Sequence, residues 1–401
     1  MKDSLVKEKD QCCGCGSCVL ACPTGAIKMV PRELGCLYPE IDTRKCVNCR
    51  RCEQVCAFAG EEKRNQTAPR TLAAAAKDGA VLKRSASGGV FAALAHRFID
   101  AGGVVYGCSL ETVDGLLSPV HIGVQDHGEV AKLQGSKYVQ SSLGTVFEEI
   151  RQLLKEGRIV LFSGTPCQVD ALKHFVKGTD TSNLYTVDII CHGVPSAELF
   201  RKYLKTLESP KKKKITAFYF RDKSRGWGLQ ASYMYQRKNG AVKTQKLPSG
   251  LSSYYSFFLQ SETYRESCYS CPYANAARVG DITIGDFWGI EQEHPRYLRE
   301  NGGKFSVRDG ISAILVNGPH GEELIAAFGD ALEQETSGLE SVARWNSQLR
   351  GPSVHSGVRW ELAVAYDAEG YSGVERIFRQ RLGIRYPVRK IKQWYADKLK
   401  H

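Results

Sequence analysis

The sequence predicts a protein of mixed α+β and α/β class, with a small cysteine-rich domain, a larger mixed α/β domain and a helical C-terminal tail. Ten of the 15 cysteines lie within residues 1–60. From about residue 85 to 330, short apolar runs alternate with amphipathic segments. The C-terminal segment has a helical pattern and is rich in lysine and arginine. We therefore expect domains at 1–62 and 85–335, a linker at 63–84 and a basic helical extension at 336–401.

The composition is that of a folded globular protein. The chain has 401 residues, of which 42% are hydrophobic and 24% charged, enough for two or three domains. No apolar run approaches the ~18–20 residues that span a bilayer, and Met1–Glu8 lacks the apolar stretch of a signal peptide. We therefore expect a cytoplasmic protein with reduced thiols, in which 15 cysteines indicate metal or redox chemistry rather than disulfides.

The net charge of +12 would suit a nucleic-acid-binding protein, but no zinc-finger, RRM or helix-turn-helix pattern accompanies it. The excess is concentrated in Lys211–Lys214 and near the C-terminus. A basic surface also attracts an acidic protein, an anionic cofactor or a membrane face. We expect no nucleic-acid partner, and peripheral docking through the basic tail; a plain solvated helix is the alternative there.

Periodicity and helix-end signals predict the elements of the larger domain. Val90–Ala101 carries its apolar residues on one face and ends at Gly102-Gly103. Thr165-Pro166 provides an N-cap and a first helical residue. Continuous apolar runs indicate buried strands, and the βαβα order predicts a partly parallel sheet. The predicted strands are 104–107, 159–162, 184–190, 215–220, 229–236, 241–247, 281–284 and 311–316; the predicted helices are 90–101, 145–155, 165–176, 197–207 and the segment from 361 onward.

Two cysteine runs near the N-terminus form the most specific motif of the chain. Cys12-x2-Cys15-x2-Cys18-x3-Cys22-Pro23 is the run of bacterial ferredoxins, and a second such run follows it. Three thiolates spaced in this way wrap one corner of an iron–sulfur cube, and the fourth comes from the other run. The runs therefore predict two [4Fe-4S] clusters. The first has Cys12, Cys15, Cys18 and Cys56 as ligands, and the second has Cys46, Cys49, Cys52 and Cys22.

Structural zinc is the alternative for these runs, but a zinc pair does not account for two complete four-cysteine runs. Ala57 stands where a second proline is usual, which leaves the ligand count unchanged. Cys13 and Cys36 are surplus. Adjacent cysteines cannot easily bind one cube together, so the spacing favours Cys12 over Cys13. We expect Cys36 to pack within the segment between the runs.

Four cysteines of the larger domain suggest a third metal site. Cys268-x2-Cys271 is a metal half-site, Cys167 opens a helix after a buried strand, and Cys191 ends the next strand. Because strand ends meet at one rim of an α/β sheet, these four thiols can converge there. Iron–sulfur and zinc both suit such soft ligands, and the spacing alone leaves this choice open. Cys108 is interpreted as a core thiol.

Other polar elements have both a functional and an ordinary interpretation. The segment Ser85–Gly89 opens a helix whose amides can hold a pyrophosphate, but an ordinary N-cap is the commoner meaning. His192 beside Cys191 is either a proton donor or a hydrogen-bonded rim residue. The charges of Arg221–Lys223 are interpreted mainly as an exposed cluster at a strand end, and Asp286 as part of a strand and turn.

Six motifs follow one another in the chain: Ser85-Ala-Ser-Gly-Gly89, Gly135-Ser-Lys-Tyr138, Gly164-Thr-Pro-Cys-Gln168, Cys191-His-Gly-Val-Pro-Ser196, Cys268-x2-Cys-Pro-Tyr273 and Gly285-Asp-Phe-Trp-Gly289. Together, over roughly residues 5–330, they resemble the coenzyme F420 hydrogenase/dehydrogenase beta-subunit family, here with an N-terminal two-cluster ferredoxin domain. The resemblance implies bound FAD and a third [4Fe-4S] cluster on Cys167, Cys191, Cys268 and Cys271. It also implies flavin binding near Ser87, Gly88, Gly89, Lys137, Tyr138, Thr165 and His192.

The resemblance further implies an iron–sulfur flavoprotein oxidoreductase. We expect electrons to pass from an external ferredoxin or other redox partner through three clusters to FAD, and then to a small-molecule acceptor. That acceptor is coenzyme F420 or another metabolite, since similar proteins reduce 7-hydroxymethyl chlorophyll and many bacterial relatives lie among cell-surface polysaccharide genes. His192 and Lys137 are the candidate catalytic residues for proton supply or charge stabilisation. The alternative is a non-catalytic electron-transfer subunit that feeds a partner enzyme.

Overall fold

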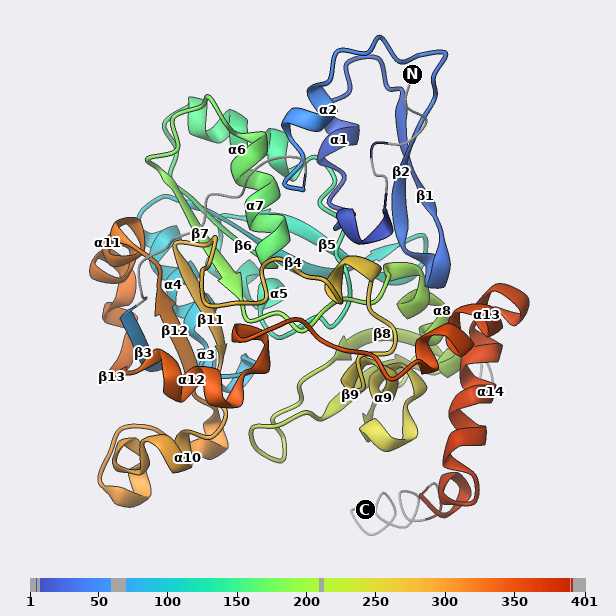
Figure 1. The fold of residues 1–401 in the computed structure, drawn as a ribbon. Helices are drawn as coiled ribbons and strands as arrows, with labels where there is room; N and C mark the ends of the chain where they lie inside the picture. The colour runs from blue at the N-terminus through green and yellow to red at the C-terminus, as the bar shows by residue number, and fades with distance from the viewer. Residues whose placement is uncertain (1–4, 6–7, 59–69, 209–212, 390, 392–401) are drawn as a thin grey trace.

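The computed structural model of the chain describes residues 5, 8–58, 70–208, 213–389 and 391. A small N-terminal lobe stands on a larger body, and helices α13 (Val358–Glu369) and α14 (Tyr371–Leu382) flank one side of that body (Figure 1). The fold is of mixed α+β and α/β class, as predicted. Within the described ranges, no helix combines the length and apolar character that a membrane span requires.

Two cysteine loops and a hairpin make up the N-terminal lobe. Helix α1 (Ser17–Leu20) follows Gly16, and α2 (Arg51–Gln54) follows Arg50; both preceding residues have positive φ. Because this left-handed conformation turns the chain sharply, each loop folds back against its own short helix. Helices α1 and α2 contact each other. Strands β1 (Ile27–Pro31) and β2 (Leu37–Ile41) pair antiparallel.

An eight-stranded sheet forms the centre of the body, in the order β13-β3-β12-β11-β7-β6-β4-β5. Strands β4, β6, β7 and β11 are joined by parallel pairing, which confirms the predicted partly parallel sheet, and the other pairs are antiparallel. Parallel strands end at one edge, so the segments after β6, β7 and β11 meet there. The strands are β3 (Arg70–Ala76), β4 (Val104–Val113), β5 (Leu116–Val124), β6 (Val160–Gly164), β7 (Leu184–Ile189), β11 (Ile282–Asp286), β12 (Ser312–Val316) and β13 (Leu332–Ser337).

Helices cover both faces of the sheet. Val105 and Leu161 pack in one apolar cluster with α4, whereas the neighbouring Val104 and Phe162 pack in another with α6 and α7. Thr165 and Gln168 form a capping box at the start of α7. The helices of the described body, besides α13 and α14, are α3 (Gly79–Arg84), α4 (Val90–Asp100), α5 (Val130–Leu133), α6 (Val146–Lys155), α7 (Pro166–Phe175), α8 (Ala197–Glu208), α9 (Ser253–Leu259), α10 (Ile290–Glu293), α11 (Pro319–Phe328) and α12 (Leu339–Trp345).

The predicted linker at 63–84 is wrong where the structure describes it. Residues 70–76 form β3, between β12 and β13 in the central sheet, and α3 follows. The alanine run there has low intrinsic strand propensity, but both faces of β3 are buried: Ala74 and Ala76 face one apolar cluster, and Ala73 and Ala75 face another. Small side chains let the neighbouring layers pack closely. The part of the linker at 63–69 lies outside the described residues.

A second, three-stranded antiparallel sheet carries β8 (Lys214–Tyr219), β9 (Ala231–Gln236) and β10 (Val242–Leu247). The predicted turn at Asn239-Gly240 joins β9 to β10, and Gly240 has the positive φ of 81° that such a turn needs. This sheet shares an apolar cluster with α8, α9, α13 and α14. The C-terminal helices therefore bury one face, which rules out a freely solvated helix in the described part of the tail.

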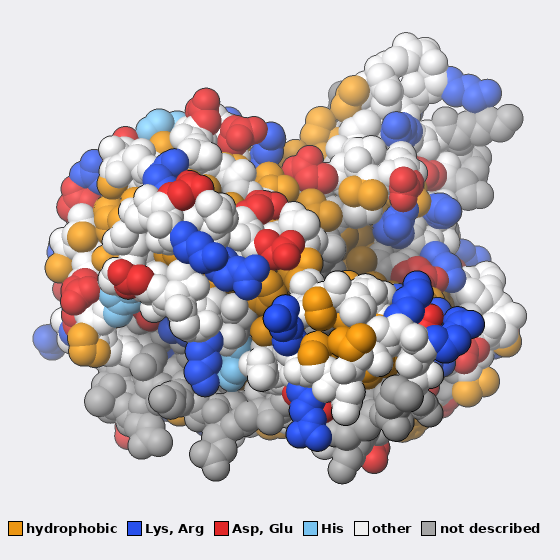
Figure 2. Space-filling model, turned by 90° about the horizontal axis from the view of Figure 1, so that it is seen from above, with side chains coloured by type: hydrophobic (Ala, Val, Ile, Leu, Met, Phe, Trp, Pro, Cys, Tyr) orange, Lys and Arg blue, Asp and Glu red, His pale blue; other side chains and the backbone are white. Residues whose placement is uncertain are grey.

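Opposite charges are mixed over the described surface. On the face seen in Figure 2, lysine and arginine side chains lie among aspartate and glutamate side chains rather than in one patch. In α14, Arg376 pairs with Glu369 and Arg379 with Glu375. The basic excess of the tail is thus partly neutralised within the described residues. Lys211, Lys212 and residues 392–401 lie outside them.

Candidate functional site

The first predicted cysteine group converges in the N-terminal lobe. The thiols of Cys12, Cys15 and Cys56 lie close enough to that of Cys18 to interact with it electrostatically. Burial, followed by the charges of these neighbours, raises the pKa of Cys18. Burial also raises the pKa of Cys12, whose sulfur accepts a hydrogen bond from the Gly14 amide at 3.3 Å. The four thiols expected to bind the first cluster are therefore neighbours.

The second predicted group is more exposed. Cys49 is exposed to solvent and interacts with Cys52, whose pKa is raised by burial. Cys22 lies two residues beyond α1 and accepts a hydrogen bond from the Ala26 amide at 3.2 Å. The structure thus joins Cys49 to Cys52. The described contacts of Cys22 are within its own loop, so they leave its predicted place in the second cluster a prediction.

The third predicted group converges at the edge of the central sheet. Cys167 lies in the first turn of α7 after β6, Cys191 follows β7, and Cys268 ends a short 3₁₀ helix. These thiols and that of Cys271 interact electrostatically with one another. Burial raises the pKa of Cys268 to about 12 and that of Cys271 to about 11. The structure therefore brings together all four cysteines that the sequence predicts at this rim.

The spacing of these thiols bears on the choice between zinc and iron–sulfur. Among the described residues, no three His, Cys, Asp or Glu side chains lie close enough to hold a single metal ion. Four sulfurs about 2.3 Å from one zinc ion must lie within about 4 Å of each other. Each ligand of a cube binds a different iron, so the sulfurs lie further apart. Among the described residues, the thiols of this group therefore do not meet the spacing that a single zinc ion requires.

Cys13, which the sequence leaves without a role, lies between the first and third groups. Its thiol is hydrogen-bonded to Cys15 on one side and to Cys167 on the other. These hydrogen bonds raise the pKa of Cys13 well above its usual value, and they lower the pKa of Cys15 to about 6. The pKa of Cys167 is lowered for the same reason. In the sequence, the only signal for this position of Cys13 is that it directly follows the ligand-spaced Cys12. Cys36 is buried within the lobe, as predicted.

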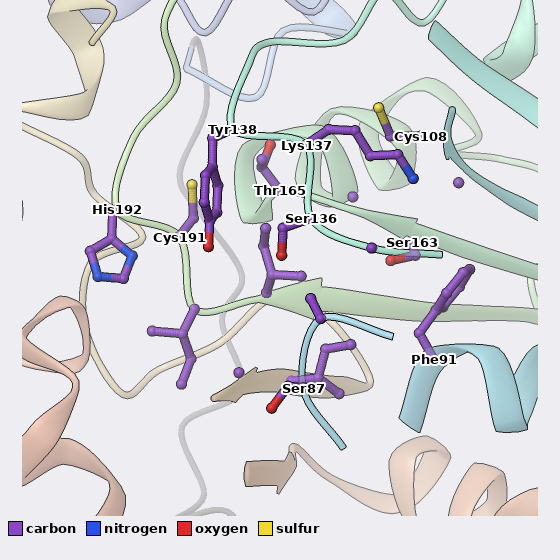
Figure 3. Close-up of a pocket in the computed structure, with 18 of the residues that line it drawn as sticks. Ser87, Phe91, Cys108, Ser136, Lys137, Tyr138, Ser163, Thr165, Cys191 and His192 are labelled. Atoms are coloured by element: carbon purple, nitrogen blue, oxygen red, sulfur yellow. The ribbon is translucent and has the colours of Figure 1, made fainter. Parts of the chain in front are cut away.

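A cavity of about 290 Å³ lies beside the third group. Its lining includes six of the seven residues predicted near a flavin, namely Ser87, Gly89, Lys137, Tyr138, Thr165 and His192. Figure 3 shows Tyr138, Thr165, Cys191 and His192 around this hollow. Gly88 does not line it: its amide donates to Ser312 Oγ at 3.0 Å, and a Cβ atom there would come within 2.4 Å of the Ala74 carbonyl oxygen. Gly88 therefore acts through close backbone packing.

Cys13, Cys167 and Cys191 line the same cavity. The cavity therefore shares a wall with the third cysteine group and with the junction to the N-terminal lobe. Cys108, predicted as a core thiol, is half-buried and also lines the cavity, so that interpretation is corrected. It ends up there because β4 continues beyond Gly107 in its pairing with β5, which carries Cys108 past the central core.

Two titratable side chains line the cavity with altered proton affinity. Lys137 Nζ donates to the carbonyl oxygens of Gln134 at 2.8 Å and Lys132 at 3.1 Å. Burial lowers the pKa of Lys137 to about 8. Burial also lowers the pKa of His192, and Asp286 opposes that shift. Lys137 can therefore change protonation state just above neutral pH, whereas burial favours the neutral imidazole of His192.

The predicted exposed charge cluster at Arg221–Lys223 is wrong for two of its residues. Arg221 is buried and donates to both carboxylate oxygens of Asp286, at 2.9 and 3.1 Å. Its guanidinium also donates to the Tyr138 hydroxyl at 3.1 Å. Lys223 donates to the backbone carbonyl of Ser87 at 2.6 Å. Because β8 ends against the large sheet, these cations position cavity residues instead of facing solvent.

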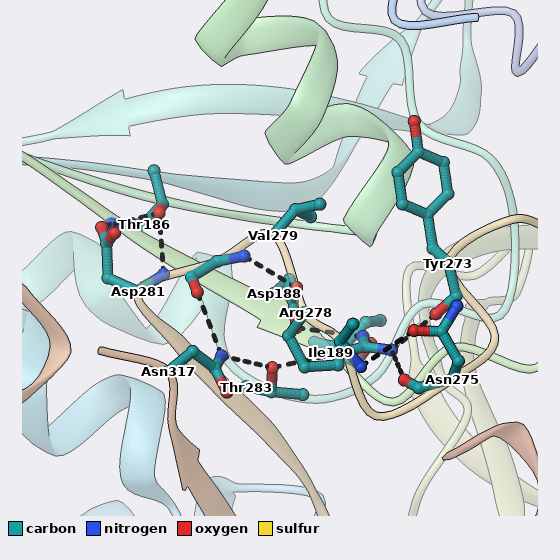
Figure 4. A network of polar contacts seen from close by, with 12 residues as sticks. Thr186, Asp188, Ile189, Tyr273, Asn275, Arg278, Val279, Asp281, Thr283 and Asn317 are labelled. Carbon is teal, nitrogen blue, oxygen red and sulfur yellow. Dashed lines mark hydrogen bonds and ion pairs between the residues drawn. The ribbon is translucent and has the colours of Figure 1, made fainter. Parts of the chain in front are cut away.

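A buried ion pair fixes the loop that follows Cys271. Arg278 donates to Asp188 Oδ1 at 3.0 Å, and also to the backbone carbonyls of Ile189 and Tyr273 at 2.8 and 2.7 Å (Figure 4). Asp188 also accepts from the Gly280 amide at 2.9 Å. The network ties the end of β7, which leads to Cys191, to the loop that carries Cys271. It fixes the positions of the Cys191 and Cys271 thiols relative to each other.

Comparisons with known proteins give two family matches. Residues 157–341 match the family described as the C terminus of the coenzyme F420 hydrogenase/dehydrogenase beta subunit. Residues 11–59 match a 4Fe-4S dicluster domain. A chain of the F420-reducing [NiFe] hydrogenase complex from Methanosarcina barkeri, from a xenon-derivatization structure, is 17% identical, with a TM-score of 0.42 over 81% of this chain and 97% of that chain. The comparison with curated proteins gave no match.

The two family matches cover separate cysteine groups. The dicluster match contains both N-terminal runs, and the beta-subunit match contains Cys167, Cys191, Cys268 and Cys271. The chain is therefore an iron–sulfur electron-transfer protein with ferredoxin-like runs. Over residues 157–341 it is similar to the C terminus of the coenzyme F420 hydrogenase/dehydrogenase beta subunit, and over residues 11–59 to a 4Fe-4S dicluster domain.

Proposed function

We propose that the chain is an FAD-dependent iron–sulfur oxidoreductase that takes electrons from an external ferredoxin-type donor and passes them to a small-molecule acceptor. The observation that carries this proposal is the continuity of the cysteine groups. Cys13 joins the first group to Cys167 of the third, and Cys13 and Cys167 both line the cavity. Cys52 interacts electrostatically with both Cys49 and Cys18 of the first group, so clusters in these groups would form one path from the exposed Cys49 to the cavity.

Three [4Fe-4S] clusters fit the donor sets. Cys12, Cys15, Cys18 and Cys56 would hold the first, and Cys46, Cys49, Cys52 and Cys22 the second. The third would be held by Cys167, Cys191, Cys268 and Cys271. Thiolates are the ligands that such clusters need. The third-group thiols are only half-buried, which supports a cluster partly shielded from water, and the exposure of Cys49 supports electron entry at the second.

The cavity fits a flavin. It is lined by small residues on one side, such as Ser87 and Gly89, and by the Tyr138 ring, which stacks on Phe258 at 4.5 Å between centroids. Small residues allow a large planar group to approach the backbone, and an aromatic wall suits a ring system. When bound, FAD converts single electrons into a two-electron transfer.

Lys137 and His192 are the proposed catalytic residues. Lys137 Nζ is held by two backbone carbonyls at the cavity wall, where its charge would stabilise an anionic ring and its proton is available near neutral pH. His192 lies at the opposite side of the hollow in Figure 3, beside Cys191. Its imidazole would supply or receive a proton at the acceptor. The acceptor is coenzyme F420 or another metabolite.

Loss of Cys167 tests the proposed path. Anaerobically prepared Cys167→Ala protein is expected to keep its flavin and to lose ferredoxin-linked reduction of the acceptor, because the third cluster loses a ligand. Cys36→Ala is the matched control: it removes a buried thiol of the N-terminal lobe that is neither a proposed ligand nor part of the cavity lining, and it should keep ferredoxin-linked reduction. Unchanged ferredoxin-linked turnover in Cys167→Ala would refute the path.

A non-catalytic electron-transfer subunit is the second candidate. The matched family is named for a subunit of larger enzymes, which favours this alternative. A purified chain that reduces small acceptors alone supports the enzyme. A chain that exchanges electrons only in the presence of a partner protein supports the subunit. The proposed N-terminal domain at 1–62 applies to both candidates, whereas the larger domain proposed at 85–335 must be extended to include β3 and all of β13, which lie in its central sheet.

A further inference from the structure

Arg265 differs from the other arginines buried in the described residues. The others each have a carboxylate partner: Arg221 pairs with Asp286, Arg278 with Asp188, and Arg359 with Glu266. Arg265 is buried, with only 1% of its surface exposed. None of its described hydrogen-bond partners is a carboxylate. Its nearest acidic neighbour in the chain, Glu266, is engaged by Arg359 at 3.0 Å.

Arg265 reaches into the N-terminal lobe instead. Its Nε donates to the Cys12 carbonyl oxygen at 2.6 Å, and its Nη2 donates to the Leu37 carbonyl oxygen at 2.7 Å and to Cys12 Sγ at 3.4 Å. The guanidinium lies over the Tyr38 ring, 4.1 Å from its centroid, and Nη1 is 3.5 Å from Gln140 Oε1. All these partners are neutral except for the sulfur, which becomes a thiolate when it binds iron.

A buried guanidinium without an anion carries a large desolvation penalty. The groups around Arg265 that can become negative are mainly thiols. It interacts electrostatically with Cys12, then with the non-ligands Cys36, Tyr38 and Cys13, and also with Cys15 and Cys268. Two of these are proposed ligands of the first cluster, and Cys268 is a proposed ligand of the third. The missing counter-charge of Arg265 is therefore the iron–sulfur sites themselves.

We propose that Arg265 is the positioning residue that raises the reduction potential of the cluster held by Cys12, Cys15, Cys18 and Cys56 above that of the second cluster. The inference rests on the proposed function, because it requires the clusters to be present. Each reduction adds one negative charge to a cluster, and a fixed cation in a poorly screened environment favours the reduced state.

The second cluster has no equivalent within the described residues. The arginines of its loop, Arg44, Arg50 and Arg51, are exposed, so water and salt screen their charge. An electron that enters at the exposed Cys49 would then move toward the first cluster, which lies against the third group. Arg265 also precedes Cys268 by three residues, and its amide donates to the Val194 carbonyl at 2.9 Å. One short segment thus supplies both the cation and a ligand of the next site.

The test is an EPR-monitored redox titration of the anaerobic holoprotein. Arg265→Gln is expected to change the reduction equilibrium of one cluster at least tenfold toward the oxidised state, which corresponds to about 59 mV for a one-electron couple. Arg265→Lys should restore most of the shift, because it keeps the charge. Arg51→Gln is the matched control on the exposed loop, and its cluster potentials should stay within about threefold of wild type.

A second variant tests the charge without removing the arginine. Gln140→Glu places a carboxylate beside the guanidinium, and it should shift the same cluster in the same direction as Arg265→Gln. Cluster potentials within twofold of wild type in both variants, at full iron content, would overturn the inference and leave the proposed function intact. Wild-type protein without iron–sulfur signals would overturn the proposed function and this inference together.

Discussion

The thiols of Cys13 and Cys167 are hydrogen-bonded to each other, although one belongs to the N-terminal lobe and the other to the first turn of α7. This contact places a non-ligand thiol between two proposed clusters. Gln140 secures the same junction, because its Nε2 donates to the Cys13 carbonyl oxygen at 2.7 Å. The lobe and the body are therefore docked at the point where electrons would cross.

Removal of Cys13 should separate its structural role from iron binding. Cys13→Ala is expected to keep the full iron content, because Cys12 has the ligand spacing. It should lower the free energy of unfolding by roughly 1–3 kcal/mol, because the hydrogen bond that the single Cys13 S–H shares between the Cys15 and Cys167 sulfurs is lost. Iron analysis and anaerobic denaturation check this. Loss of about four irons per chain would instead make Cys13 a ligand.

His121 should make the protein sensitive to mild acid. Burial lowers its pKa to about 4, and the ring is enclosed by Ser141 Oγ at 2.9 Å and the Ser163 carbonyl at 3.0 Å. The unfolded chain takes up a proton below about pH 6.5 and the folded chain only near pH 4, so stability is lost as the pH falls through that window. We expect a loss of about 2 kcal/mol between pH 7 and 5.

The His121→Gln variant checks this assignment by denaturant unfolding at both pH values. Its stability should fall by about 2 kcal/mol less than that of wild type over the same interval. His127→Gln is the control, because His127 is exposed. Equal acid sensitivity of the wild type and His121→Gln would contradict the prediction.

Lys137 should make the turnover rate fall on the alkaline side of its pH profile. Because burial lowers its pKa to about 8, its proton and charge are lost as the pH rises through 8. If the ammonium acts on the flavin or acceptor, acceptor reduction falls over that range. Lys137→Met should lose roughly 100-fold in rate and show no such fall, whereas Lys137→Arg should keep the charge at pH 9. Flavin content, measured in each variant, separates binding from turnover. An identical pH profile in wild type and Lys137→Met would exclude Lys137.

The ion pair between Arg278 and Asp188 should be essential to the third site. Arg278→Met leaves the fully buried Asp188 carboxylate without its cation, which costs about 3–5 kcal/mol. The loop that carries Cys271 should loosen, and about four irons should be lost before the other eight during chelator challenge. The double variant Arg278→Met, Asp188→Asn should recover part of the stability. Chelation kinetics indistinguishable from wild type would show that this pair does not support the site.

Local sequence signals predicted the parts of the fold that depend on local physics. The N-cap at Thr165, the turn at Gly240 and the alternation of strands and helices all reappear. The gathering of Cys167 and Cys191 followed from the parallel order of β6 and β7, which such alternation favours.

Features set by tertiary contacts could not be predicted in this way. The alanines of β3 lack strand propensity and form a strand only because β12 and β13 flank them. Arg221 is buried because it pairs with Asp286, 65 residues further along the chain, and no local signal indicates that partner. Arg265 and Cys13 make their contacts only because the N-terminal lobe docks onto the body. No spacing rule in the sequence encodes that docking.

The most direct measurement of the central claim is cofactor analysis of the anaerobically isolated wild-type chain. We predict about 12 iron and 12 acid-labile sulfide per polypeptide, four of each for every cluster, together with one FAD identified by its absorbance and by chromatography after release. A chain with about four irons or none, and without a flavin chromophore, would contradict the account.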